Sequence, residues 1–226
     1  MPWDPRTCLF LPNGINTAAT QTARPIWVKA VDEVGNGFTA DYGDQSIPLY
    51  SIVQANEQDI DAFPIWFLPY KQDDIKHRIL DGRRAKIMLT AVMSGCTFGI
   101  GTRTNAGTVI VSHANNYSMN GGENQRLAQQ NATQQALGNR SQIVDPRLYR
   151  SRRNSVNFGQ QDEALIFGIY SEMEGYIEQG RSRFKHALLN VKHVFKSSTP
   201  RWRFYQTRYK GGGGSWEVIE LAKRLD

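Results

Sequence analysis

The segment Ala85–His113, AKIMLTAVMSGCTFGIGTRTNAGTVIVSH, decides the fold of this chain. Its beginning, Ala85–Met93, is rich in large apolar and β-branched residues, which predicts a buried strand. A Ser-Gly pair ends that strand. Two more strands, Cys96–Thr102 and Thr108–Ser112, follow with a glycine-containing turn between them, as in a β-hairpin. Pairing within this hairpin brings the cysteine at its start close to the histidine that follows its end.

Strands are predicted on both sides of this segment, which indicates a sheet-rich fold. They cover Ile26–Val31, Gly37–Tyr42, Ile47–Val53, Phe63–Tyr70, Ala164–Tyr170, Val191–Phe195 and Arg201–Tyr209. Pro64 and Pro69 confine their strand to a sheet edge, or leave its ends without ladder bonds. The segment Lys71–Arg84 is polar and is predicted as a connection.

One helix is predicted in the first half of the chain, over Asn124–Leu137. Leu127 lies on its apolar side, Gly138 is placed to end it, and its many glutamines are expected to face solvent. The glycine-rich run before Ser215 predicts a turn. The final segment, Ser215–Leu225, has spacings that fit either a helix or a strand.

Length and composition favour one catalytic domain over residues 1–226. A chain of 226 residues with 40% hydrophobic and 21% charged residues buries enough surface to need neither metal nor disulfide. Its two cysteines, Cys8 and Cys96, form no disulfide framework and match no zinc-ligand spacing, so no cofactor is expected. The apolar runs fall short of the ~18 residues of a transmembrane helix. The start, Met1–Gly14, lacks the features of a secretory signal peptide.

The net charge indicates an anionic partner. Lys and Arg total 27 against 21 Asp and Glu, a formal charge of +6, which suits nucleic acid or an acidic protein. A nucleic-acid-binding module is therefore the alternative function, because Arg201–Tyr205 interleaves basic and aromatic residues. Strand alternation gives a simpler explanation, with Trp202 and Phe204 facing the core and Arg201 and Arg203 facing solvent. Nucleic acid is accordingly disfavoured as a partner.

The hairpin offers a nucleophile and a base. A cysteine thiol becomes a useful nucleophile when a neighbouring imidazole takes its proton and a third group orients that imidazole. Cys96 and His113 fit the first two roles, and the hydroxyl of Thr90 fits the third. Ser94 and Gly95 would turn the chain so that backbone N–H groups face a developing oxyanion. In a straight strand Thr90 would lie about 20 Å from the cysteine, so this site needs a bend at Ser94-Gly95 or a histidine that reaches across from the neighbouring strand.

Spacing alone leaves a buried core cysteine and a structural histidine as the alternative. A papain-like protease is a further alternative, but no Asn or Asp after His113 is placed by a signature of that class. His77, His186 and His193 are predicted to be surface or structural residues. The basic clusters Arg147–Arg153 and Arg181–Lys210 are expected to be solvated faces that can also steer an acidic partner.

The motif Leu89–Cys96 (LTAVMSGC), followed by a strand, a turn and His113, resembles the Ser-Gly-Cys signature of toxin glutamine deamidases. That family includes the catalytic domain of cytotoxic necrotizing factor, dermonecrotic toxin and Burkholderia lethal factor. The segment Trp66–Gln72 (WFLPYKQ) is similar to one in Burkholderia lethal factor, as is the pattern from Tyr205-Gln206 to Trp216. The Thr-Cys-His spacing is also similar to that of the chemotaxis receptor deamidase. The connection between cysteine and histidine is longer here than in Burkholderia lethal factor.

The resemblance implies an α+β fold, a mixed β-sandwich core flanked by helices and long loops. It also implies a monomeric bacterial toxin or effector, secreted or injected without a classical signal peptide, that acts in the host cytosol. The expected reaction is deamidation of a glutamine in a host protein. A translation-initiation DEAD-box helicase is the favoured target and a Rho GTPase the second. Catalysis is expected from Cys96, His113 and Thr90, with Ser94 and Gly95 shaping the oxyanion turn.

Overall fold

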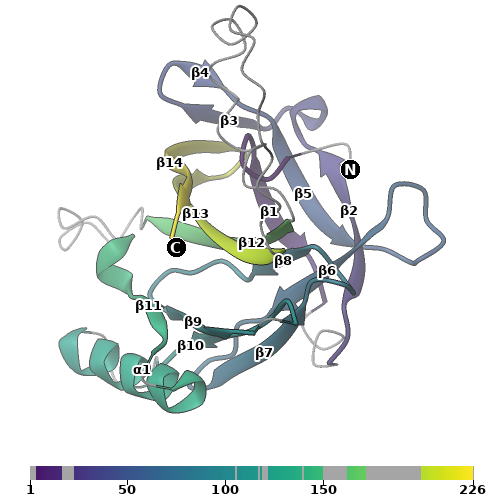
Figure 1. Cartoon of the computed structure of the whole chain (residues 1–226). Coiled ribbons are helices and arrows are strands. Elements are labelled where there is room, and N and C mark those ends of the chain that lie inside the picture. Colours follow the sequence, from purple (N-terminus) through teal and green to yellow (C-terminus); the bar gives the residue numbers. More distant parts are fainter. Residues whose placement is uncertain are drawn as a thin grey trace, which may run out of the picture.

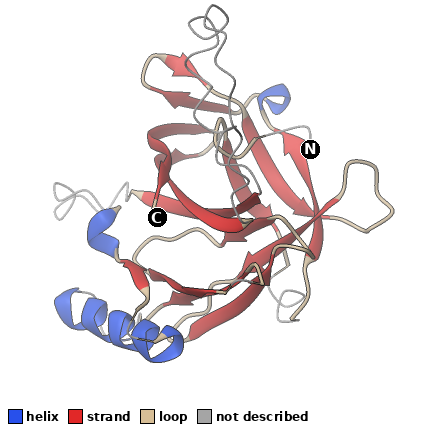
Figure 2. Ribbon diagram, viewed as in Figure 1, coloured by secondary structure: helices blue, strands red, loops and turns tan. Residues whose placement is uncertain are grey.

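Two β-sheets and one long helix make up the part of the chain that the structure describes (Figure 1). The structure is a computed structural model that describes residues 4–16, 23–104, 106–116, 118, 122–138, 140–149, 162–171 and 200–225. Strand dominates over helix (Figure 2). The predicted α+β class with a mixed β core is confirmed.

The strands follow one another along most of the chain. They are β1 (Leu9–Gly14), β2 (Ile26–Asp32), β3 (Thr39–Tyr42), β4 (Gln45–Ser46), β5 (Leu49–Gln54), β6 (Phe63–Leu68), β7 (Ile75–Asp81), β8 (Ile87–Thr90), β9 (Thr97–Arg103), β10 (Thr108–Ala114), β11 (Gln142–Val144), β12 (Glu163–Ser171), β13 (Arg201–Gly212) and β14 (Ser215–Arg224). The helix α1 spans Gly122–Leu137, and two short 3₁₀ helices, η2 and η4, span Val34–Asn36 and Pro146–Leu148.

The large sheet has ten strands in the order β1-β5-β2-β6-β8-β12-β13-β14-β3-β4, and the small sheet has four in the order β11-β9-β10-β7. Neighbours in the large sheet are antiparallel except for the parallel pairs β1–β5, β6–β8 and β14–β3. The small sheet is antiparallel throughout. The chain passes from the large sheet to the small one between β8 and β9.

Two hydrophobic cores explain the long apolar runs of the central strands. One lies on the concave face of the curled large sheet and joins residues from strands far apart in its order, such as Leu9 of β1 and Val218 of β14. The other lies between the two sheets and includes Trp66, Met88 and Phe98. Strands such as β6 and β8 therefore supply side chains to a core on each face, and such strands read as continuous hydrophobic segments.

Several predicted strands have the expected positions, and others are corrected. The strand β6 lies between β2 and β8, so it is not at an edge, and its prolines stand at its ends. The strand β7 falls within Lys71–Arg84, which polar composition predicted as a connection. Ser215–Leu225 contains β14, the strand alternative, which follows a turn at residues 211–214. The predicted strand Val191–Phe195 lies outside the described residues.

The helix α1 covers the outer face of the small sheet with a polar surface. Its fully or nearly buried side chains are Gln129, Thr133 and Leu137, whereas Leu127 is exposed. The prediction that the glutamines face solvent is thus wrong for Gln129. The reason lies in the facing strand, where a Cβ at Gly99 would come within 3 Å of Thr133 and Leu137 side-chain atoms. Glycine there allows a close approach in which a buried amide reaches the strand.

The C-terminal basic-aromatic segment belongs to the core. Trp202 and Phe204 pack between the sheets, as alternation predicted. Arg203, however, is only 1% exposed and donates a hydrogen bond to the hydroxyl of Ser171. The prediction of a solvated Arg203 is wrong because β13 is an interior strand, covered on both faces. The rings of Trp202 and Phe204 are therefore buried in the core.

Candidate functional site

Cys96 lies where the chain crosses between the sheets. The strand β8 ends at Thr90 in the large sheet, and β9 begins at Thr97 in the small one. Between them Met93 forms a bridge with Ala164, its N–H donating to the Ala164 carbonyl at 2.8 Å. Gly95 has φ 149°, a conformation that residues with a side chain rarely adopt. The bend that the sequence argument required is therefore present, at the predicted glycine.

The hairpin register places Cys96 and His113 on one face. His113 pairs with Phe98 and Ala114 pairs with Thr97, so Cys96 continues the register opposite Asn115. Alternation then puts the side chains of Cys96, Asn115 and His113 on the face toward the large sheet. Cys96 and His113 are diagonal neighbours, whose Cβ atoms in a sheet are about 7 Å apart and whose side chains can meet.

The thiol of Cys96 is buried and hydrogen-bonded. The residue is 2% exposed, and the side-chain Nδ2 of Asn115 donates to its Sγ at 3.2 Å. The hydroxyl of Tyr149 donates to the Cys96 carbonyl at 2.7 Å. Donation of an N–H to sulfur favours the thiolate over the thiol. Neither Asn115 nor Tyr149 was predicted from sequence. Asn115 stands two positions beyond His113, so alternation carried one step past the histidine would have found it.

His113 is a buried histidine whose ring nitrogens, within the described part of the chain, make no hydrogen bond. Burial lowers its pKa from 6.5 to about 4, and the nearby Leu68 carbonyl, which favours the charged ring, opposes that shift. The ring of Tyr70 lies over it, with centroids 6.1 Å apart and planes at 58°. His113 is therefore neutral at pH 7.

Thr90 is buried but serves another partner. Its Oγ1 accepts a hydrogen bond from the N–H of Ile166 on β12 at 3.1 Å. No hydrogen bond joins it to the His113 ring. The strand β8 lies inside the large sheet, where β12 engages the Thr90 hydroxyl. The main-chain group that acts on the ring is instead that of Leu68, the residue that pairs with Thr90 across β6 and β8.

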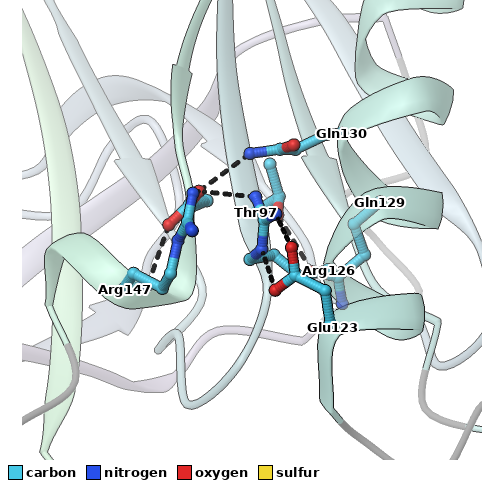
Figure 3. A network of polar contacts seen from close by, with 7 residues as sticks. Thr97, Glu123, Arg126, Gln129, Gln130 and Arg147 are labelled. Atoms are coloured by element: carbon cyan, nitrogen blue, oxygen red, sulfur yellow. Dashed lines mark hydrogen bonds and ion pairs between the residues drawn. The ribbon is translucent and has the colours of Figure 1, made fainter. Parts of the chain in front are cut away.

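The Gly95 turn is tied to α1. Oε1 of Gln129 accepts from the Thr97 hydroxyl at 2.9 Å (Figure 3). Nε2 of Gln129 donates to the Gly95 carbonyl at 3.1 Å. Both bonds are buried or partly buried. The two residues flanking Cys96 are thus held by one side chain, while Ser94 is exposed.

Further polar contacts anchor α1 to the segment before Tyr149. Oδ2 of Asp145 accepts from Arg126 at 3.2 Å, from Gln130 at 2.8 Å and from Arg147 at 3.3 Å (Figure 3). Asp145 is 6% exposed, and a buried carboxylate with several donors is well compensated. This network fixes the helix that carries Gln129 relative to the segment that carries Tyr149.

The second family-like segment, Trp66–Gln72, lies beside the cysteine and the histidine. Leu68 and Tyr70 approach His113, as described above. The chain then turns so that the Asp74 carbonyl accepts from the Asn115 N–H at 3.0 Å. The two stretches that carry the resemblance therefore meet in space, although nothing in their sequence spacing requires it.

Other candidate residues lie elsewhere. His77 is exposed on β7, and the Arg103–Gly107 turn is at the far end of the hairpin from Cys96. Arg147, with a 65% exposed side chain, is close in sequence to Tyr149 and so on the cysteine's side. Of the second predicted basic cluster, the structure describes Arg201, Arg203, Arg208 and Lys210. The other basic residues of the two clusters, and His186 and His193, lie outside the described residues.

The described residues contain neither a metal-ion site nor a membrane-spanning helix. No three or more of their His, Cys, Asp or Glu side chains are arranged to hold a metal ion. No helix among them has the length and apolarity to cross a membrane. The other thiol, Cys8, is buried, and burial raises its pKa to about 12, which leaves almost no thiolate near neutral pH.

Comparison with known proteins identifies no relative: no protein family model matches the chain, and no curated protein matches it significantly in sequence.

Proposed function

We propose that this protein is a glutamine deamidase that uses Cys96 as nucleophile and His113 as general base. The observation that carries the proposal is the shared face of the hairpin, where a thiol that accepts a hydrogen bond from Asn115 neighbours a buried, neutral histidine. A core cysteine needs no such donor, and an imidazole with only the Leu68 carbonyl near its ring nitrogens is costly to bury unless it has another use.

The reaction follows from these groups. His113 takes the proton of Cys96, and the thiolate attacks the carboxamide carbon of a glutamine side chain. The tetrahedral oxyanion is held by N–H donors beside the sulfur. It collapses as the C–N bond breaks, His113 returns the proton to the departing nitrogen, and ammonia leaves a thioester. Water, deprotonated by His113, then cleaves the C–S bond to give glutamate and free thiol.

A protein substrate suits this site better than a free amino acid. Conversion of glutamine to glutamate adds a negative charge with little change of shape, enough to disable a phosphate-binding surface or a site that needs an amide donor. The formal charge of +6 favours association with acidic proteins. Arg147 is a candidate contact because it is exposed and close in sequence to Tyr149.

The family resemblance selects the first substrates to try. We propose a host translation-initiation DEAD-box helicase first and a Rho GTPase second, modified in the host cytosol by a protein that a bacterium secretes or injects. The choice of the helicase as first target depends on the resemblance of the Trp66–Gln72 segment to Burkholderia lethal factor, and this segment borders His113. The end of this segment follows the strand β6, and connections of this kind decide which partner a site admits.

The decisive experiment compares the wild-type protein with Cys96→Ser in a eukaryotic cell extract. Mass spectrometry should find one or a few Gln-to-Glu conversions with the wild type and none with the variant, whose circular dichroism should be unchanged because sulfur and oxygen differ little in volume. Equal conversion by the folded variant would remove Cys96 from the mechanism. Purified helicase and GTPase, offered side by side, then separate the two candidate targets.

A further inference from the structure

Gln129 on α1 is a buried side chain that hydrogen-bonds to both neighbours of the proposed nucleophile. It is 0% exposed. Its amide donates to the Gly95 carbonyl at 3.1 Å and accepts from the Thr97 hydroxyl at 2.9 Å. The amide orientation is determined by Gly95, because an amide oxygen facing a carbonyl oxygen would place two acceptors together.

The bond to Gln129 turns the peptide between Gly95 and Cys96 out of the sheet. In a regular strand the carbonyl points sideways, toward the neighbouring strand. Here it points outward, since Gln129 belongs to α1, the helix on the outer face of the small sheet (Figure 1). Gly95 permits this orientation because its φ of 149° carries no side-chain penalty.

An outward carbonyl implies an inward N–H. In a planar trans peptide the C=O and the following N–H are antiparallel. The N–H of Cys96 therefore points to the inner face of the sheet, the face on which its Sγ lies. Nδ2 of Asn115 approaches the same sulfur at 3.2 Å. Two N–H groups, those of the Cys96 backbone and the Asn115 amide, thus lie on the sulfur's side of the sheet, where an oxyanion on a substrate bound to Cys96 would form.

We infer that Gln129 is a positioning residue, which sets the Cys96 N–H as an oxyanion donor by holding the Gly95 carbonyl away from the site. This inference rests on the proposed deamidase function. Gln129 touches no reacting atom, and its effect passes through one peptide plane. Loss of its amide would free the peptide to rotate and would remove stabilisation that exists only in the transition state.

The test uses Gln129→Met, which keeps the side-chain length without the hydrogen bonds, and Gln129→Glu, which keeps the acceptor for Thr97 but faces the Gly95 carbonyl with oxygen. Thr133→Val is the matched control, because it is buried one turn further along the same helix face and its Oγ1 has no hydrogen-bond partner within the described residues. Gln-to-Glu conversion gives kcat and KM, iodoacetamide alkylation of Cys96 gives thiol reactivity, and urea unfolding reports the fold.

Whichever Gln129 variants fold should lose about 10²-fold in kcat with KM nearly unchanged, as for removal of an oxyanion donor. Alkylation of Cys96 should stay within about threefold of wild type, since that displacement forms no oxyanion. Thr133→Val should retain its kcat. A folded Gln129 variant with wild-type kcat would overturn the inference, as would a parallel fall in alkylation and kcat. A wild type without any conversion would instead refute the proposed function, and the inference with it.

Discussion

Acidification should destabilise the protein through His113. The imidazole is neutral in the fold down to a pKa of about 4, whereas in the unfolded chain it titrates at its ordinary value of 6.5. Between these two values the unfolded chain binds more protons than the native state, so stability falls as pH falls. Well above pH 6.5 the ring is neutral in both states, and His113 does not lower the free energy of unfolding. By pH 4 that free energy should have fallen by about 3 kcal/mol, because each pH unit between the two pKa values costs about 1.36 kcal/mol.

The assay is urea unfolding of the wild type and His113→Gln at a series of pH values from 7.5 to 4. Glutamine is neutral throughout, so the difference between the two proteins isolates the histidine from other groups that titrate in this range. The stability advantage of the wild type over the variant should shrink by about 3 kcal/mol across the series. His77→Gln, an exposed site on β7, is the matched control and should keep the wild-type pH profile. Parallel curves for wild type and His113→Gln would refute the reasoning.

Three further outcomes are expected. Thr90→Val should cost about 1–2 kcal/mol in urea unfolding because the Ile166 N–H loses its acceptor, and should lower kcat less than His113→Ala; the reverse order of kcat would restore a catalytic role for the Thr90 hydroxyl. Tyr149→Phe should destabilise by about 1–3 kcal/mol, since it leaves the Cys96 carbonyl without this donor; an unchanged unfolding midpoint would argue against that bond. Titration with duplex and single-stranded nucleic acid at physiological salt should reveal only weak, steeply salt-dependent binding, and tight sequence-dependent binding would favour the alternative function.

The parts of the fold that sequence predicts are those fixed by local pattern. The β9–β10 hairpin, the crossing at Gly95 and the end of α1 at Gly138 follow from turn chemistry and apolar runs that tertiary packing reinforces. The strand β7 was missed because Lys76, His77 and Arg78 interrupt its apolar residues. Backbone pairing with β10 makes this segment a strand, although its composition does not predict one.

The candidate site likewise has a part that the sequence predicts and a part that it does not. Cys96, His113 and Asn115 belong to one hairpin, so short-range register relates them. Leu68, Gln129 and Tyr149 reach the site from other elements through side-chain packing and single hydrogen bonds. No periodicity in their own segments marks them. Thr90 was predicted from spacing alone, and spacing cannot reveal that a neighbouring strand engages its hydroxyl.

The sheet order has a consequence for the time at which the protein matures during synthesis. The strand β8, which leads to Cys96, lies between β6 and β12, and β14 pairs with β3. A nascent chain that has emerged only as far as the β9–β10 hairpin already holds Cys96 and His113, but it lacks the strands that complete the large sheet. Such long-range pairings form late and slowly. The ribosome must therefore release most of the chain before the thiol and the imidazole acquire their final surroundings, so truncated translation products should be inert.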